Sequence, residues 1–224
     1  MTLNKLKAGL AGLALAGEVA LPLSAQAADP AESGYGSFSG GVAFTTDYRF
    51  RGVTQTDLDP AIQGNIDWSY DMFYAGIWGS NIDFGTDAAV EIDLYAGVTF
   101  DFEGIGVDIG GIYYLYPNAG DPNNAELDYF EAKIGLSYDV GVASLGLTYY
   151  YSPEFTGEIG KAHYFEGSVA VPVFDKVEVS AAIGHQAFDR SGNVDYTTWN
   201  IGATYAVTDN VSVDVRYVDT DQTT

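Results

Sequence analysis

Cysteine is absent from the 224 residues of this chain. A disulfide scaffold and a thiolate metal site are therefore both excluded. Histidine is scarce, with only His163 and His185 present, and each alternates in step with nearby apolar residues. The sequence offers no serine–histidine–acid arrangement around them. Two acidic loops, residues 57–59 and 121–124, lack the full spacing of a calcium-binding loop. The sequence thus indicates a protein that is not an enzyme, and we expect no cofactor or metal ion.

Long apolar runs are also scarce, and the one candidate lies at the N-terminus. Two lysines precede a mostly apolar stretch over residues 8–23, and Ala25-Gln26-Ala27 provides a cleavage site. This pattern predicts a signal peptide, residues 1–27, that is removed on export. Residues 28–36 are then expected to form a short periplasmic segment. No later stretch offers about 20 uninterrupted apolar residues, so no membrane-spanning helix is predicted.

Basic residues are few, with 9 Lys and Arg against 31 Asp and Glu. Removing Lys5, Lys7 and Glu18 with the signal peptide leaves 7 basic and 30 acidic residues, a formal charge of −23. Such acidity argues against nucleic acid as a partner, because phosphate contacts require Lys and Arg. Disorder is also disfavoured, because aromatic residues make up 14% of the chain.

The chain does contain a strict alternation of polarity. Within residues 90–101 the even-numbered positions are all apolar, whereas Glu91, Asp93 and Asp101 occupy odd-numbered ones. Successive side chains of a strand point to opposite faces, so this segment has one apolar face and one charged face. Segments of about ten residues with this pattern are typical of a transmembrane β-barrel.

Eleven such segments predict an all-β fold, a single antiparallel transmembrane barrel over residues 37–224. The connections are alternately long and tight, as expected for long extracellular loops and short periplasmic turns. This rhythm favours the cell outer membrane, with a periplasmic N-terminus, over a soluble β-sandwich. The expected strands are residues 37–51, 60–70, 73–83, 89–102, 105–116, 127–138, 142–152, 161–173, 177–187, 195–207 and 211–218.

The count of eleven is odd, whereas a single-chain bacterial barrel has an even number of strands. By the alternation of connections, residues 219–224 fall in an extracellular loop. We therefore expect a twelfth strand in the complete protein, so that this chain lacks its last strand. A miscounted strand is the alternative.

Two expected strands are less regular than the others. Trp78 lies on the opposite parity from the apolar Ile77, and Tyr114 on the opposite parity from Tyr113. Each strand thus carries large apolar or aromatic side chains on both faces.

Several segments resemble a known family, the proteobacterial TorF-like porins, also described as the Gcw_chp family of uncharacterised function. The resemblance covers essentially the whole mature chain and implies an outer-membrane location and a porin function. It assigns no catalytic or ligand-binding residue. The motifs that carry it are TTDYRFRGVTQ at 45–55, FYAGIWGSNIDF at 73–84, EIDLYAG at 91–97, GIYYLYP at 111–117 and YYSP at 150–153.

Charged residues cluster on the first expected strand. Asp47, Arg49 and Arg51 share a parity and are predicted to face the lumen, while Tyr48 and Phe50 are predicted to face lipid. Rings of charged side chains set the selectivity of pores, so the arginines are candidates for a constriction. The alternative is a structural ion network that neutralises acidic residues across the lumen, because buried charges are unfavourable unless paired.

The lumen is expected to be acidic, and a water-filled lumen of this kind prefers cations. The alternative is that these positions are solvated and have no selective role. We expect passive diffusion of small hydrophilic solutes or ions; the other possibility is a non-conducting structural or interaction protein presenting acidic loops. Outer-membrane lipid, solutes and cations are the expected contacts, and the oligomeric state stays open. The candidate pore-lining residues are Asp47, Arg49, Arg51, Asp67, Glu91, Asp93, Asp101, Asp108, Glu131, Lys133, Glu166, Glu178, Asp214 and Arg216.

Overall fold

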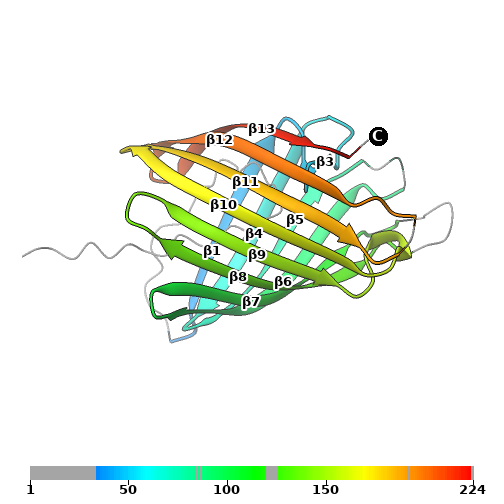
Figure 1. Ribbon diagram of the computed structural model, residues 1–224, viewed down its shortest axis with the longest axis horizontal. Coiled ribbons are helices and arrows are strands. Elements are labelled where there is room, and N and C mark those ends of the chain that lie inside the picture. The colour runs from blue at the N-terminus through cyan, green and yellow to red at the C-terminus, as the bar shows by residue number, and fades with distance from the viewer. Residues whose placement is uncertain (1–33, 84, 86, 120–125, 191, 223–224) are drawn as a thin grey trace, which may run out of the picture.

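A computed structural model describes residues 34–83, 85, 87–119, 126–190 and 192–222 (Figure 1). The expected signal peptide, residues 1–27, lies outside these described residues, and so do residues 28–33 of the segment that follows it. Their assignments therefore stay predictions.

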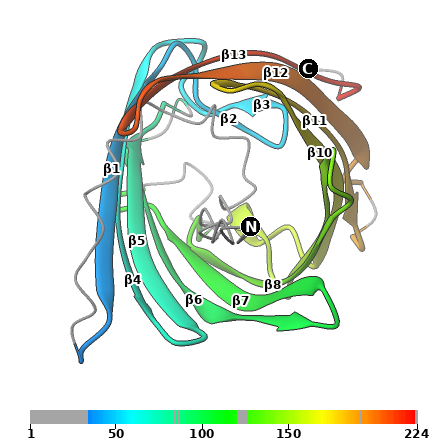
Figure 2. The same cartoon turned by 90° about the vertical axis from the view of Figure 1, so that its left-hand side faces the viewer.

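Eleven antiparallel strands form the main sheet, in which each is paired with its neighbours in sequence. The sheet curls around a central space, the lumen (Figure 2). This confirms the all-β antiparallel fold and excludes two packed sheets for the described part of the chain. The eleven strands are β1 (Ser37–Thr45), β4 (Ala61–Tyr70), β5 (Phe73–Asn81), β6 (Val90–Phe102), β7 (Ile105–Leu115), β8 (Tyr129–Asp139), β9 (Ser144–Ser152), β10 (Ala162–Phe174), β11 (Val177–Phe188), β12 (Tyr196–Thr208) and β13 (Val211–Thr220).

Every predicted strand except the first agrees with an observed strand to within two residues at each end. The connections alternate as expected, so we call one rim of the barrel the long-loop end and the other the short-turn end. A 3₁₀ turn, η1 (Thr156–Glu158), lies in one of the long loops. Among the described residues, no helix is long and apolar enough to cross a membrane.

The two edge strands of the sheet, β1 and β13, are not paired with each other in the described part of the chain. Both run from the short-turn end to the long-loop end, because ten antiparallel pairings separate them. A strand running the other way between them would pair antiparallel with both. The twelfth strand stays a prediction, and its place would be between β1 and β13.

The alternation of polarity sets the two faces of the sheet. On β8, Tyr129, Glu131 and Lys133 are buried, whereas Phe130 and Ile134, on the opposite face, are exposed on the outer surface. Large apolar side chains are exposed on the outside of other strands as well, among them Phe165 and Val215. The predicted assignment of the faces is confirmed on these strands.

The first strand is where the prediction was wrong. Thr45 is the last residue of β1 and pairs with Ala61, and the expected continuation to residue 51 does not form. The Thr45 hydroxyl donates a hydrogen bond to the Asp47 carbonyl, at 2.9 Å, at the point where the chain leaves the sheet. Residues 46–60, which we call the inner segment, enter the lumen. They contain a small separate sheet of β2 (Arg49–Phe50) and β3 (Val53–Thr54), visible inside the ring of strands (Figure 2).

Candidate functional site

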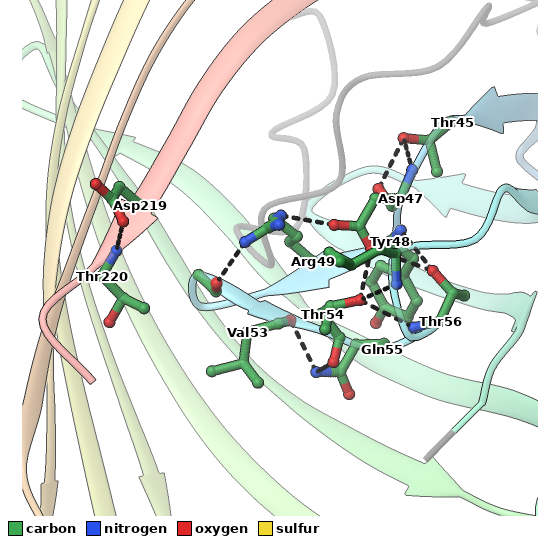
Figure 3. A network of polar contacts seen from close by, with 12 residues as sticks. Thr45, Asp47, Tyr48, Arg49, Val53, Thr54, Gln55, Thr56, Asp219 and Thr220 are labelled. Carbon is green, nitrogen blue, oxygen red and sulfur yellow. Dashed lines mark hydrogen bonds and ion pairs between the residues drawn. The ribbon is translucent and has the colours of Figure 1, made fainter. Parts of the chain in front are cut away.

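The inner segment is a folded hairpin with its own hydrogen bonds (Figure 3). The Gln55 amide donates to the Tyr48 carbonyl at 2.6 Å, which holds its two arms together. Asp47 joins the same arms, because it accepts a hydrogen bond from the Thr54 hydroxyl at 2.6 Å and pairs with Arg49 Nε at 2.7 Å. The segment is therefore a structured element within the barrel.

The hairpin turns at Arg51 and Gly52, whose φ values are +48° and +82°. Positive φ at both central residues is typical of a type I′ turn, the turn that joins twisted strands. A Cβ atom on Gly52 would lie 2.6 Å from Thr198 Oγ1 and 3.1 Å from Thr220 Cβ, so only glycine fits against β12 and β13. Arg51 carries a Cβ atom, so its positive φ is strained, unlike that of glycine. This backbone conformation costs about 1–3 kcal/mol, which the contacts of the side chain must offset.

Arg51, at the tip of the hairpin, is only 1% exposed and contacts side chains of the barrel wall. Its two terminal nitrogens lie 3.0 and 2.7 Å from the two carboxylate oxygens of Glu131 on β8. Nη1 also donates to Gln186 Oε1 on β11, at 2.8 Å. This is the planar, bidentate pairing that a guanidinium group forms with a carboxylate.

Aromatic rings complete the surroundings of the Arg51 guanidinium. Its Cζ atom lies 4.2 Å from the ring centre of Tyr164 and 5.0 Å from that of Tyr150 on the wall, and 4.6 Å from that of Phe50 in the hairpin itself. These distances are typical of cation–π contacts. Burial lowers the pKa of Arg51, the Glu131 carboxylate raises it, and the balance lies above the ordinary value. We call Glu131, Tyr150, Tyr164 and Gln186 the Arg51 cage.

The first arm of the hairpin, which leads to Arg51, contacts the wall formed by β5, β6 and β7. The Tyr48 hydroxyl donates to Glu91 Oε1 at 2.8 Å, and its ring packs edge-on against Trp78 with centroids 5.4 Å apart. Phe50 packs edge-on against Tyr114, at 5.9 Å. The prediction that Tyr48 and Phe50 face lipid was therefore wrong, because both lie inside the barrel. Burial and the nearby Glu91 carboxylate raise the pKa of Tyr48 well above its ordinary value.

Further ion pairs lie on the inner faces of the strands. Lys133 Nζ on β8 is 2.7 Å from Asp108 Oδ2 on β7, and Tyr74 donates to the same carboxylate at 2.8 Å. Arg216 pairs with Asp214 at 3.2 Å on β13. All four basic candidates are thus each paired with an acidic candidate, as Arg49–Asp47, Arg51–Glu131, Lys133–Asp108 and Arg216–Asp214.

Asp67, Glu91, Asp93, Asp101 and Glu178 have no basic partner within ion-pair distance among the described residues, and together with Glu166 they are the six remaining acidic candidates. Tyrosine hydroxyls donate to three of them, in the pairs Tyr95–Asp67, Tyr48–Glu91 and Tyr164–Glu166. Asp93 Oδ1 is buried and has no hydrogen-bond partner in the described part of the chain. Asp101 and Glu178 are exposed near the short-turn end.

The inward tyrosines and Gln186 were not predicted as functional residues from the sequence. Tyr114 stacks on Tyr129 with ring centres 4.3 Å apart, and its hydroxyl donates to Glu131 Oε2 at 3.2 Å. The irregular parity of Trp78 and Tyr114 was the available signal, because both side chains point inward to contact the hairpin.

One family comparison matches most of the chain. The family described as a bacterial protein of unknown function (Gcw_chp) matches residues 27–224. The chain belongs to this family. The Gcw_chp resemblance is thereby confirmed, whereas the TorF-like porin designation stays a prediction. No curated protein matches the chain.

Three solved structures are similar in fold. A porin refined at 1.8 Å resolution has a TM-score of 0.45 and 15% identity, over 85% of this chain and 74% of that one. Pseudomonas aeruginosa OpdL has a TM-score of 0.44 and 11% identity, over 89% and 70% of the two chains. Acinetobacter baumannii OccAB1 has a TM-score of 0.41 and 12% identity, over 89% and 65%.

Metal-binding clusters are absent from the part of the chain that the structure describes. No three His, Cys, Asp or Glu side chains among the described residues are placed to hold a metal ion. Of the two loops considered for calcium, residues 121–124 lie outside the described residues. His163 contacts the Tyr149 hydroxyl at 2.8 Å, and His185 contacts the Thr197 hydroxyl at 3.2 Å. Both histidines lie on the outward parity of their strands.

Proposed function

We propose that this chain is an outer-membrane barrel for passive diffusion of small hydrophilic solutes or ions, as its resemblance to TorF-like porins implies. The observation that carries the proposal is a barrel with an apolar outer face and a charged lumen. Phe165, Ile201 and Val215 are among the many large apolar side chains exposed on the outer face. An apolar outer face of this kind is what contact with membrane lipid requires. The long loops are then extracellular, and the N-terminus and short turns are periplasmic.

We further propose that the pathway prefers cations. Asp67, Glu91, Asp93 and the exposed acids near the short-turn end have no basic partner within ion-pair distance among the described residues. Unbalanced carboxylates inside a low-dielectric tube create a negative potential that attracts cations. The inner segment narrows the pathway at the long-loop end, and the candidate pore-lining residues would act around it.

A non-conducting structural or interaction protein is the second candidate. Close packing of the inner segment favours it, because Tyr48, Arg51 and Tyr164 are at most 3% exposed. Where side chains fill the cross-section of a barrel, solutes pass only if those side chains move aside.

Planar-bilayer conductance of the full-length protein separates the two functions. Discrete conductance steps, with a reversal potential favouring cations in a KCl gradient, are the expected result. An absence of channel conductance at all voltages and salt concentrations tested would favour the structural role. Anion preference in the unmodified protein would contradict the assignment of the lumen.

A further inference from the structure

The Arg51 cage belongs entirely to the barrel wall. Its members come one each from β8, β9, β10 and β11, and none comes from the inner segment. Tyr150 is the register partner of Tyr164, and Tyr164 is the register partner of Gln186. Three inward side chains therefore lie in one row across adjacent strands, with their spacing fixed by the sheet. The hairpin adds one contact of its own, the Phe50 ring at 4.6 Å from Arg51 Cζ, and the four cage residues are held in place by the wall.

The cage holds only the end of the Arg51 side chain. Both carboxylate contacts and the glutamine contact go to the terminal nitrogens, and the rings lie against the central carbon. Arg51 Nε, the nitrogen that leads back to the chain, has no hydrogen-bond partner among the described residues. A free guanidinium group offers every atom that the cage contacts.

We propose that the Arg51 cage is a binding site for solutes that carry a guanidinium group, and that Arg51 occupies it as an internal ligand. Such a solute competes with Arg51 and releases the inner segment from the wall. Binding of the solute in the cage does not depend on the proposed porin function, whereas any effect of the solute on permeation rests on that function. The carboxylate of Glu131 disfavours anions, and an ammonium ion lacks the planar fork that engages two oxygens at once.

An Arg51→Ala variant provides the first test, because it vacates the cage while leaving the wall unchanged. Thermal unfolding is followed by circular dichroism in detergent micelles, with millimolar guanidinium chloride or with ammonium chloride at equal ionic strength. We expect guanidinium to raise the melting temperature of the variant by several degrees in a saturable manner, as a ligand of the native state does. Ammonium should produce no comparable rise.

Two further variants act as controls. Arg216→Ala removes another lumen arginine, whose partners are Asp214, Asn200 and Ser180 and which contacts no aromatic ring among the described residues. Guanidinium should not stabilise that variant, nor the double variant Arg51→Ala/Glu131→Gln. Equal stabilisation of all three, or equal effects of ammonium and guanidinium, would overturn the proposal.

A second measurement uses the protein with Arg51 in place. Trp78 contacts Tyr48 of the inner segment, so its emission reports where the hairpin lies. In a Trp68→Phe/Trp199→Phe background, low concentrations of guanidinium chloride should shift the emission saturably, and ammonium chloride should not. No shift below denaturing concentrations would contradict displacement of Arg51. Stabilisation and emission shifts in micelles support the site even if bilayers show no conductance, a result that would refute the porin function alone.

Discussion

The long-loop half and the short-turn half of the lumen are built from the same strands, yet they are packed differently. On β10, Tyr164 is fully buried while Ser168, on the same face, is exposed. On β8, Glu131 is 1% exposed while Asp139 is exposed. The inner segment accounts for the difference, because its hairpin fills the long-loop half only. Strand number alone therefore does not determine how full this barrel is.

The two halves also use charge differently. In the long-loop half, the Arg51–Glu131 pair is removed from solvent and held by several hydrogen bonds. In the short-turn half, Asp101 and Glu178 are exposed and have no basic partner within ion-pair distance in the described chain. Charges of the first kind should govern stability, and those of the second kind should govern the local potential.

Removing the inner segment should produce the largest change. Thr45 and Ala61 are register partners, so a short Gly-Ser turn in place of residues 47–59 can join β1 to β4. We expect single-channel conductance to rise several-fold, because the long-loop half would become as open as the other half. Circular dichroism of the variant checks that the sheet is retained. Unchanged conductance in a folded variant would show that the obstruction lies elsewhere.

Glu131→Gln should have the next largest effect. It leaves the Arg51 charge buried without its carboxylate, and breaking such a pair costs about 3–5 kcal/mol of the free energy of unfolding. The measurement is denaturant unfolding in micelles. Glu178→Gln in the short-turn half is the matched control, with an expected change within about 0.5 kcal/mol.

A double variant tests whether the pair itself explains this cost. Arg51→Met with Glu131→Leu removes both charges together, and apolar replacements of buried pairs are often neutral. The double variant should therefore recover most of the stability that Glu131→Gln loses. A double variant that is less stable than Glu131→Gln would mean that packing of the hairpin, rather than the unpaired charge, dominates.

This contrast between the halves also explains what the sequence could and could not predict. Alternation along each strand follows from neighbouring residues, and it correctly predicted the wall and the inward positions of Glu131 and Lys133. The inner segment continues the same alternation through Tyr48, Arg49 and Phe50, so it was predicted to be strand. What folds it inward is contact with residues far along the chain, such as Glu131, which local periodicity cannot reveal.

Gly52→Ala should have an intermediate effect on stability. A methyl group there meets positive φ and also Thr198 Oγ1, and together these should cost about 2–3 kcal/mol. Gly104→Ala is the matched control, because Gly104 has φ +85° and no described atom lies within 4 Å of the position that the added methyl group would take. It should cost about 1 kcal/mol, measured by the same unfolding experiment. Equal losses would contradict the close approach of the hairpin to β12 and β13.

The smallest effects are expected from the exposed acids of the short-turn half. Asp101→Asn combined with Glu178→Gln should leave stability within about 0.5 kcal/mol, because neither carboxylate is buried. If the proposed cation pathway exists, the pair should lower the cation-to-anion permeability ratio modestly, and the difference should shrink as salt screens the lumen. Reversal potentials in KCl gradients at two ionic strengths provide the measurement. Glu103→Gln is the control, because Glu103 carries the same charge at the same rim but lies in the turn between β6 and β7. An equal effect of Glu103→Gln would assign the selectivity to general surface charge, and the short-turn half of the lumen would then have no selective role of its own.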